Sequence, residues 1–382
     1  MKKTISLISI LLLFSGIFAQ TKLAYVSDDY EKYGLKPGNI PEIREDGIRT
    51  GGKKGTYEWW YFDAHLEDGT AIVIIFYTKP FTEIKKGLTP FISINIDRTD
   101  GTSIKKPYYG KIENFFASDT ICDVRIDKNY FKGDLKNYQI HYEDEELTID
   151  AKIKRTSESW RPKTGHFIYG NSGKEFAWLV PVPKGKTEIT YTYKGKTYKS
   201  QGSCYHDHNF GNADMSDVVN HWYWARAELG PYNVIAAELI SVKEYAAEPI
   251  IVFNISKDGK TVADKGENVK LFRTYGKMNP EGERPVSNEL KFIYISDDKK
   301  TKFEFSLTRQ QNLMEMKIFD ALISNKIKRR LATLVTGLDP AYFRFSGTAN
   351  LKVYENDCKT EEFTGKKAFW ELMYFGKPYG IK

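Results

Sequence analysis

The segment EWWYFDAHLEDGTAIVII, Glu58 to Ile75, alternates residues that suit a core with residues that do not, turns at Asp68–Gly69, and continues as an apolar run. Side chains of a β-strand point alternately to opposite faces. A short turn that contains Asp-Gly between two such runs is a strong hairpin signal. The segment therefore predicts a β-hairpin whose core face is formed by Trp60, Phe62, Ala64 and Leu66.

A second segment, HWYWARAELGPYNVIAAEL from His221 to Leu239, has the same shape. Its alignment to the first segment places aromatic on aromatic and ionisable on ionisable residues: Trp59 on Trp222, Tyr61 on Trp224, Asp63 on Arg226 and His65 on Glu228. A repeat at this distance predicts two similar domains, each opening with an equivalent hairpin. Chance similarity is the competing explanation, because aromatic-rich strands resemble one another.

Short alternating runs recur along most of the chain, with turn signals such as DGT, KDGK and YKGK between them. This pattern and the aromatic content of 14% favour strands over helices. We predict an all-β, antiparallel protein with two domains, residues 20–205 and 206–382, that divide near residues 199–220. A length of 382 residues agrees with two hydrophobic cores.

The face opposite each core combines large aromatic rings with ionisable groups. Its members are Trp59, Tyr61, Asp63 and His65 in the first hairpin and Trp222, Trp224, Arg226 and Glu228 in the second. Such a face suits neither bulk water nor a dry core, and it is typical of a ligand cavity at a domain junction. The alternative is an inter-domain salt-bridge layer in which Asp63 pairs with Arg226 below the tryptophans. Both interpretations stay open from the sequence.

One segment, MEMKIFDALISNKIKRRLATLV from Met314 to Val335, departs from the alternation. Apolar residues recur at steps of three and four: Met316, Phe319, Ile323, Ile327, Leu331 and Leu334. This spacing predicts an amphipathic helix, and its basic residues lie mostly off the apolar face. We expect the helix to pack across a barrel. Peripheral membrane contact through the basic face is the alternative.

The N-terminal MKKTISLISILLLFSGIFAQ has the layout of a secretory signal peptide, with a basic start, an apolar run from Ile5 to Phe18 and a small residue, Ala19. We expect removal of residues 1–19 and an exported protein, periplasmic or secreted.

The formal charge of +7 is spread over hairpin turns, which predicts solubility and no nucleic-acid binding. We expect a monomer. Cys122 and Cys358 form a disulfide, or all three cysteines are buried free thiols.

The densest polar stretch is GSCYHDHNFGN, Gly202 to Asn212. If it is extended, Tyr205, Asp207 and Asn209 share one face, and His206 and His208 share the other. His206 and His208 with His221 offer a weak metal signal, because no carboxylate stands at a diagnostic spacing, and we predict neither metal nor cofactor. A serine-hydrolase site lacks its GxSxG elbow.

Acid–base chemistry fits this stretch better than a metal. A buried Asp207 below aromatic rings would stay protonated and could donate its proton, while the rings would stabilise a developing carbocation. The competing interpretation is a cluster that only satisfies the hydrogen bonds of a strand end.

Three motifs, YEWWYFDAHLEDG, GSCYHDHNFGN followed by HWYWARAEL, and AFWELMYFG, resemble the hydroxyneurosporene synthase (carotenoid 1,2-hydratase) and AttH-like lipocalin family in order and separation. The resemblance spans nearly the whole chain after the signal peptide. It implies two tandem lipocalin-like β-barrel domains with a pocket near their junction. It also implies activities that range from hydration of an isoprenoid double bond to pericyclic reactions.

The resemblance also assigns residue roles. The hydratases use a Tyr-x-Asp pair, matched by Tyr205 and Asp207, with the aspartate as proton donor. They also use a His-x-Trp pair, for which EFAWLVPVP offers Trp178 but places Phe176 at the histidine position. The phenylalanine at the histidine position puts the hydratase reaction in doubt, but not the pocket. Export also puts the hydratase reaction in doubt.

We predict a pocket lined by Trp59, Tyr61, Trp178, Tyr205, Asp207, Trp222 and Trp224, with Asp63 and Arg226 nearby. Its ligand would be a hydrophobic, isoprenoid- or lipid-like small molecule. In the enzyme hypothesis Asp207 protonates a carbon–carbon double bond, and His206 or His208 orders the water that completes hydration. The alternative is a carrier or envelope-interaction protein without chemistry. A hydrolytic or pericyclase-like enzyme is less favoured.

Overall fold

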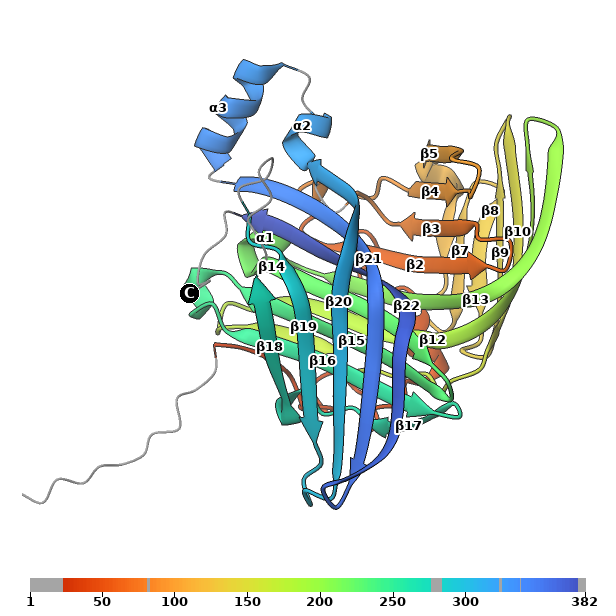
Figure 1. The fold of residues 1–382 in the computed structure, drawn as a ribbon. Coiled ribbons are helices and arrows are strands. Elements are labelled where there is room, and N and C mark those ends of the chain that lie inside the picture. The colour runs from red at the N-terminus through yellow and green to blue at the C-terminus, as the bar shows by residue number, and fades with distance from the viewer. Residues whose placement is uncertain (1–22, 81–82, 276–283, 323–324, 337, 377–382) are drawn as a thin grey trace, which may run out of the picture.

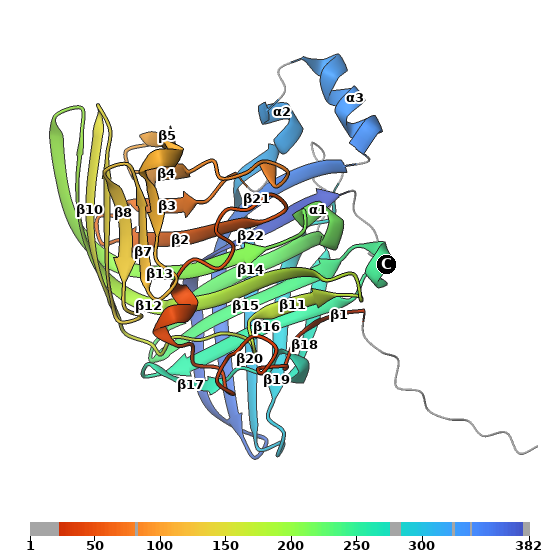
Figure 2. The same cartoon turned by 180° about the vertical axis from the view of Figure 1, so that it is seen from behind.

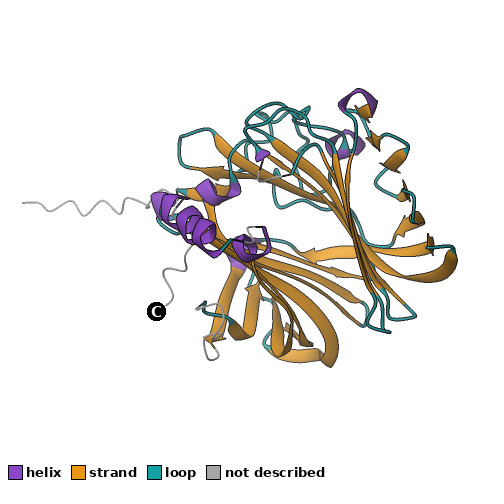
Figure 3. Ribbon diagram, turned by 90° about the horizontal axis from the view of Figure 1, so that it is seen from above, coloured by secondary structure: helices purple, strands orange, loops and turns teal. Residues whose placement is uncertain are grey.

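The computed structural model describes residues 23–80, 83–275, 284–322, 325–336 and 338–376. Two curled antiparallel sheets make up almost all of this part (Figures 1 and 2). Seen from above, they form two layers of strands, with the longer helices on one side and short helical turns elsewhere (Figure 3). The all-β, antiparallel prediction is confirmed.

The first sheet has 13 strands, in the order β5-β4-β3-β2-β13-β12-β10-β9-β8-β7-β6, with β11 pairing β12 and β1 pairing β11. Their bounds are β1 Ala24–Val26, β2 Tyr57–Leu66, β3 Ala71–Tyr77, β4 Phe91–Asp97, β5 Ser103–Tyr109, β6 Phe115–Ala117, β7 Cys122–Ile126, β8 Asn129–Gly133, β9 Asn137–Glu143, β10 Leu147–Arg155, β11 His166–Tyr169, β12 Lys174–Tyr193 and β13 Lys196–Gly211. The predicted first hairpin is β2 and β3.

The second sheet has nine strands, in the order β17-β16-β15-β14-β22-β21-β20-β19-β18. Their bounds are β14 Val219–Leu229, β15 Tyr232–Ser241, β16 Pro249–Lys257, β17 Lys260–Ala263, β18 Val269–Tyr275, β19 Ser287–Ile295, β20 Thr301–Lys317, β21 Leu338–Glu355 and β22 Cys358–Gly376. The second predicted hairpin is β14 and β15. It occupies the place in this sheet that β2 and β3 occupy in the first, beside a long hairpin, so the two hairpins are equivalent in topology as well as in sequence.

Strand alternation explains where the cores lie. Trp60, Phe62 and Ala64 of β2 point into a core enclosed by the first sheet, and Tyr223, Ala225 and their neighbours point into the core of the second. A third apolar cluster lies between the sheets. The side chains that face away from both cores therefore meet between the two sheets.

The division at residues 205 and 206 stays a prediction. Strand β13 crosses this position and continues in the first sheet to Gly211. The second sheet begins with β14 at Val219, after the short helix α1, Met215–Val218.

The predicted C-terminal helix is present as two helices, α2 (Ile318–Leu322) and α3 (Lys326–Thr336). Met316 belongs to strand β20, and Ile323 lies outside the described residues. The expected packing across a barrel is wrong, because α3 stands out from the end of the second sheet and exposes its apolar residues (Figure 1). None of the described helices is long and apolar enough to cross a bilayer.

Two further predictions concern the N-terminus and the cysteines. The signal peptide, residues 1–19, lies outside the described residues, so its removal stays a prediction. All three cysteines are free; Cys122 and Cys204 are buried and Cys358 is exposed on β22, which corrects both the disulfide and the fully buried alternative.

Candidate active site between the two sheets

Three neighbouring strands of the first sheet bring the predicted acid to one face. In the register of β13 with β2, Asp207 lies opposite Tyr61 and Tyr205 lies opposite Asp63. In the register of β12 with β13, Trp178 lies opposite Asn209. Since residues opposite one another share a face, these side chains all point toward the second sheet.

Asp207 lies at the centre of a hydrogen-bond network. Its Oδ2 accepts hydrogen bonds from Trp178 Nε1 at 3.1 Å and from the Tyr205 hydroxyl at 2.9 Å. Its Oδ1 accepts one from Asn209 Nδ2 at 2.7 Å. The structure therefore places Trp178 beside the Tyr-x-Asp pair, as the resemblance implied. Phe176, which stands at the histidine position, packs at ring-centroid distances of 6.4 Å from Trp59 and 5.3 Å from Phe167 instead.

Burial governs the acidity of Asp207. Its side chain is 8% exposed, and loss of hydration raises its pKa from 3.8 to about 7. The hydrogen bonds from Tyr205 and Asn209 oppose this rise because they stabilise the carboxylate. The result is an acid that is substantially protonated at neutral pH and that leaves three donors around its conjugate base after it gives up the proton.

The second sheet supplies the opposite wall. Trp224 of β14 lies 5.3 Å from the Tyr205 ring and 6.4 Å from the Tyr61 ring, centroid to centroid. Arg226 forms a buried ion pair with Asp63, and its guanidinium lies 5.8 Å from the Tyr205 ring. The predicted pairing of Asp63 with Arg226 is thus present, and it joins the two sheets directly beside the acid.

A second ionisable group on this wall, Glu371, was not among the site residues predicted from the sequence. Glu371 of β22 lies opposite Trp224 on one side and opposite Arg344 of β21 on the other. Burial raises the pKa of Glu371, while the charge of Arg344 and a hydrogen bond from the Tyr342 hydroxyl oppose the rise. The motif AFWELMYFG contains Glu371, but only the pairing of β22 with β14 reveals which side chains it faces.

His206 and His208 are not part of this site. They point from β13 into the core of the first sheet and are fully buried there. His206 Nε2 lies 3.3 Å from Asp46 Oδ2, and His208 Nε2 lies 2.8 Å from Glu58 Oε1. This placement corrects the hypothesis that they order a water molecule at Asp207, because the strand itself separates them from the carboxyl group.

The three histidines of the weak metal signal are also not brought together. His221 packs against Tyr374 in the second sheet and contacts Asn220 Oδ1 through Nδ1 at 2.9 Å. Within the described residues, one group brings potential metal-ligand atoms within 4.8 Å of one another: Asp46, Cys122 and His206. These three could hold a cation only after the Cys122 thiol lost its proton, and burial beside Asp46 raises the pKa of that thiol well above its usual value.

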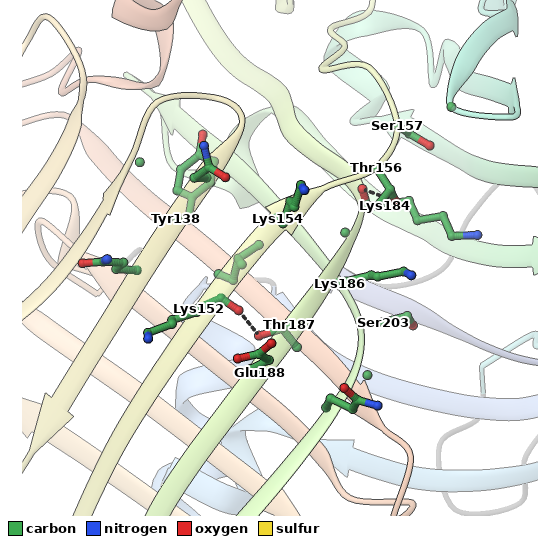
Figure 4. A pocket seen from close by; sticks show the side chains of 18 of the residues that line it. Tyr138, Lys152, Lys154, Thr156, Ser157, Lys184, Lys186, Thr187, Glu188 and Ser203 are labelled. Carbon is green, nitrogen blue, oxygen red and sulfur yellow. Dashed lines mark hydrogen bonds between the residues drawn. The ribbon is translucent and has the colours of Figure 1, made fainter.

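A large hollow of about 1280 Å³ opens at one end of the first sheet, beyond the site (Figure 4). It is lined by lysines such as Lys152, Lys154 and Lys184, and by His65 and Glu228. The last two continue the strand faces that carry Asp63 and Arg226. The ion pair therefore lies between this hollow and the aromatic side chains around Asp207.

Solved structures share the fold. A protein described as AttH from Nitrosomonas europaea matches 90% of this chain and 99% of its own, with a TM-score of 0.57 and 11% identity. CghA in complex with Sch210972 matches 94% and 99%, with a TM-score of 0.56 and 12% identity. Kievitone hydratase from Nectria haematococca matches 88% and 94%, with a TM-score of 0.52 and 13% identity. The likeness confirms the predicted lipocalin-like fold.

Sequence comparisons match parts of the chain. Residues 131–319 match the Diels-Alderase-like family. The chain is 28% identical over 206 residues to hydroxyneurosporene dehydrogenase of Chlorobaculum tepidum, which covers 45% of this chain and 53% of that protein. It is 31% identical over 97 residues to quinolone epoxide rearrangement protein penF of Penicillium thymicola, which covers 25% of each. The chain thus spans about half or less of the curated relatives that it matches. Together the likenesses point to the lipocalin-like hydratases and Diels-Alderase-type proteins as a group, and to no single enzyme among them.

Proposed function

We propose that this protein binds an apolar, isoprenoid-like molecule against the aromatic surface between the sheets and adds water to one of its carbon–carbon double bonds. The observation that carries the proposal is the environment of Asp207, a buried carboxyl group whose pKa of about 7 lets it remain protonated beside aromatic rings. The similarity to a kievitone hydratase and to a hydroxyneurosporene dehydrogenase supports a substrate of this kind.

In the proposed reaction, the Asp207 carboxyl group donates its proton to one carbon of the double bond, and the π electrons form the new C–H bond. A carbocation remains on the other carbon, where the faces of Tyr61 and Trp224 stabilise it through cation–π attraction. The oxygen of a water molecule attacks this carbon, and the oxonium ion loses a proton to a base. The net change is the addition of one water molecule, without an electron acceptor.

Glu371 is the proposed base. It faces the same inter-sheet surface from the second sheet. Burial raises the pKa of the Tyr61 hydroxyl on the first sheet, and the negative charge of Glu371 adds to that rise. A carboxylate with a raised pKa is a stronger base than an exposed one, which suits it to accept the proton from the attacking water. Asp207 and Glu371 then form an acid and a base on opposite walls.

The Glu371→Gln variant tests this role. We expect about a 100-fold decrease in kcat because the attacking water loses its proton acceptor. The rise of activity with pH that reflects ionisation of Glu371 should disappear, while the fall near pH 7 that reflects Asp207 should remain. The matched control is Glu362→Gln on the exposed part of the same strand. An unchanged pH profile in Glu371→Gln would show that Glu371 is not the base.

The pH dependence of activity tests the acid. Because Asp207 acts in its protonated form, kcat/KM should fall about tenfold per pH unit above about pH 7. Tyr205→Phe removes a hydrogen bond that lowers the pKa of Asp207, so the falling limb should move to higher pH. Tyr191→Phe, in the core of the first sheet, is the control that should leave the limb in place. A limb that moves to lower pH in Tyr205→Phe would contradict the proposed geometry.

The test of the function itself is mass spectrometry of the organic extract after incubation of the protein with linear carotenoids and total envelope lipid. We expect a product heavier by one water molecule, with the added oxygen derived from ¹⁸O-labelled water. A bound apolar ligand that co-purifies and stays chemically unchanged would instead support a carrier. A product of unchanged mass but altered connectivity would support a pericyclic reaction, the alternative that the Diels-Alderase-like match favours.

Export stays part of the proposal. It rests on the three-part N-terminal sequence, and N-terminal sequencing of the protein recovered from the envelope or the medium would test it, with a mature start at Gln20 as the expected result.

A further inference from the structure

Helix α3 carries its apolar face on the outside of the molecule. Ile327, Leu331, Leu334 and Val335 are 77%, 57%, 80% and 75% exposed. At 3.6 residues per turn they fall within one arc of about 100°. The opposite side carries Ala332, Thr333 and Arg329, which are half-buried, and Arg329 forms an ion pair of 3.0 Å with Asp320 of α2. A helix that served only to cover a core would present the reverse orientation.

Cations flank this apolar arc on both sides. On the same helical projection, Arg330 borders one edge of the arc and Lys328 borders the other, and both side chains are exposed, as is Lys326. An apolar stripe between rows of lysine and arginine is the pattern of a helix that lies in the surface of a membrane. The apolar residues enter the acyl region, and the cations contact anionic headgroups.

The helix pair α2–α3 is connected to the candidate active site. Ile318, the first residue of α2, packs against the buried inter-sheet apolar cluster, and the half-buried Trp59, Tyr61 and Trp224 pack against the same cluster. Helix α2 lies against β20 and β21, and α3 lies against β21 (Figures 1 and 3). A membrane that binds α3 would therefore lie at the end of the molecule that carries α2 and α3.

We propose that α3 docks this protein on an anionic lipid bilayer, and that the apolar ligand passes between the bilayer and the inter-sheet surface. Docking follows from α3 alone, whereas the passage of ligand rests on the proposed function. A second copy of the chain fits the same face less well. Symmetric pairing through α3 would bring the cations Lys328 and Arg330 of one copy close to the cations of the other, and like charges repel.

Flotation of the mature chain with vesicles tests the docking. We expect co-flotation with vesicles of phosphatidylcholine and phosphatidylglycerol, weaker co-flotation with phosphatidylcholine alone, and a decrease as salt is raised. Leu331→Asp with Leu334→Asp should lower partitioning about 100-fold or more, since two apolar anchors are lost. Both positions are exposed, so the variant should fold like the wild type. The matched control is Val262→Asp with Phe272→Asp, at exposed apolar residues of β17 and β18.

The charge contribution is tested separately. Replacement of Lys328 and Arg330 by Gln should weaken partitioning about fivefold for each cation removed, and only on the anionic vesicles. Lys300→Gln with Lys366→Gln, at an exposed loop position and an exposed position of β22, is the control. Equal flotation of the Leu331 and Leu334 variant and the wild type would overturn the docking. The docking would also be overturned if the wild type failed to float and was a dimer in solution that the Leu331 and Leu334 variant converted to a monomer.

The ligand route has its own readout. Turnover of a substrate embedded in the vesicles should fall in the Leu331 and Leu334 variant, while turnover of the same substrate in detergent micelles should stay at the wild-type rate. Flotation without turnover in either medium would refute hydration and retain docking. Equal turnover by variant and wild type in the vesicles would overturn the ligand route alone.

Discussion

The Asp207→Asn variant should fold, bind the apolar ligand and lose about 10²–10⁴-fold in kcat, because an amide cannot donate the proton that starts the reaction. Asparagine keeps the shape of the side chain, and its oxygen can still accept the hydrogen bonds of Trp178 and Tyr205. The measurement is the single-turnover rate of product formation, with ligand affinity determined separately by quenching of the tryptophans between the sheets.

The same variant should change stability in a pH-dependent way. The pKa of Asp207 is raised from 3.8 to about 7 in the folded protein, so the folded state retains a proton that the unfolded chain loses in this range. The stabilising contribution is complete below pH 3.8 and is lost as pH rises through about 7. Relative to Asp207→Asn, the wild type should lose roughly 4 kcal/mol of unfolding free energy across this range, from three pKa units at about 1.4 kcal/mol each.

Asp217→Asn, an exposed replacement in α1, is the matched control and should change neither turnover nor this slope. Full turnover by Asp207→Asn would exclude Asp207 as the proton donor. A pH-independent difference in stability between wild type and variant would show that the carboxyl group is ionised in the folded protein, and the acid mechanism would fail with it.

The sequence predicted the faces of the strands because alternation is a local property. Knowing that β2 and β13 are extended is enough to place Tyr61 and Asp63 on one face and Trp60 and Phe62 on the other. The same alternation places the side chains of His206 and Asp207 on opposite faces of β13. The hypothesis that gave both residues a catalytic role was inconsistent with it. The contact of Trp178 with Asp207 came from the family resemblance, since no spacing relates the two residues.

The remaining features could not be predicted from the sequence, because they depend on contacts between segments that are far apart along the chain. Glu371 becomes a site residue only because β22 pairs with β14, a partner about 150 residues earlier in the chain. The three- and four-residue spacing of α3 identified its apolar face, but nothing in that spacing states whether the face points inward or outward. Orientation depends on what surrounds a helix, and for α3 the inner side is formed by Ala332 and Thr333.

Removal of one partner of the Arg226–Asp63 ion pair should be the electrostatic change between the sheets that lowers stability most. Both side chains are buried, and burial alone would lower the pKa of Arg226, but the charge and hydrogen bond of Asp63, with the charges of Glu228 and Tyr61, leave that pKa raised. Arg226→Met leaves the Asp63 carboxylate buried without its partner, so we expect a loss of about 3–5 kcal/mol in unfolding free energy. Chemical denaturation at pH 7 measures it.

The double variant Asp63→Asn with Arg226→Met separates the structural role of the pair from a role in binding the ligand. Removal of both charges eliminates the unpaired ion, so stability should recover to within about 1–2 kcal/mol of the wild type. If the pair only joins the sheets, the double variant should also recover kcat/KM. If Arg226 orients the ligand beside the Tyr205 ring, kcat/KM should stay low although the protein is stable. We expect the second result, because the guanidinium lies 5.8 Å from the ring of Tyr205, whose hydroxyl donates a hydrogen bond to Asp207. Recovery of both quantities would assign the pair to the sheet junction alone.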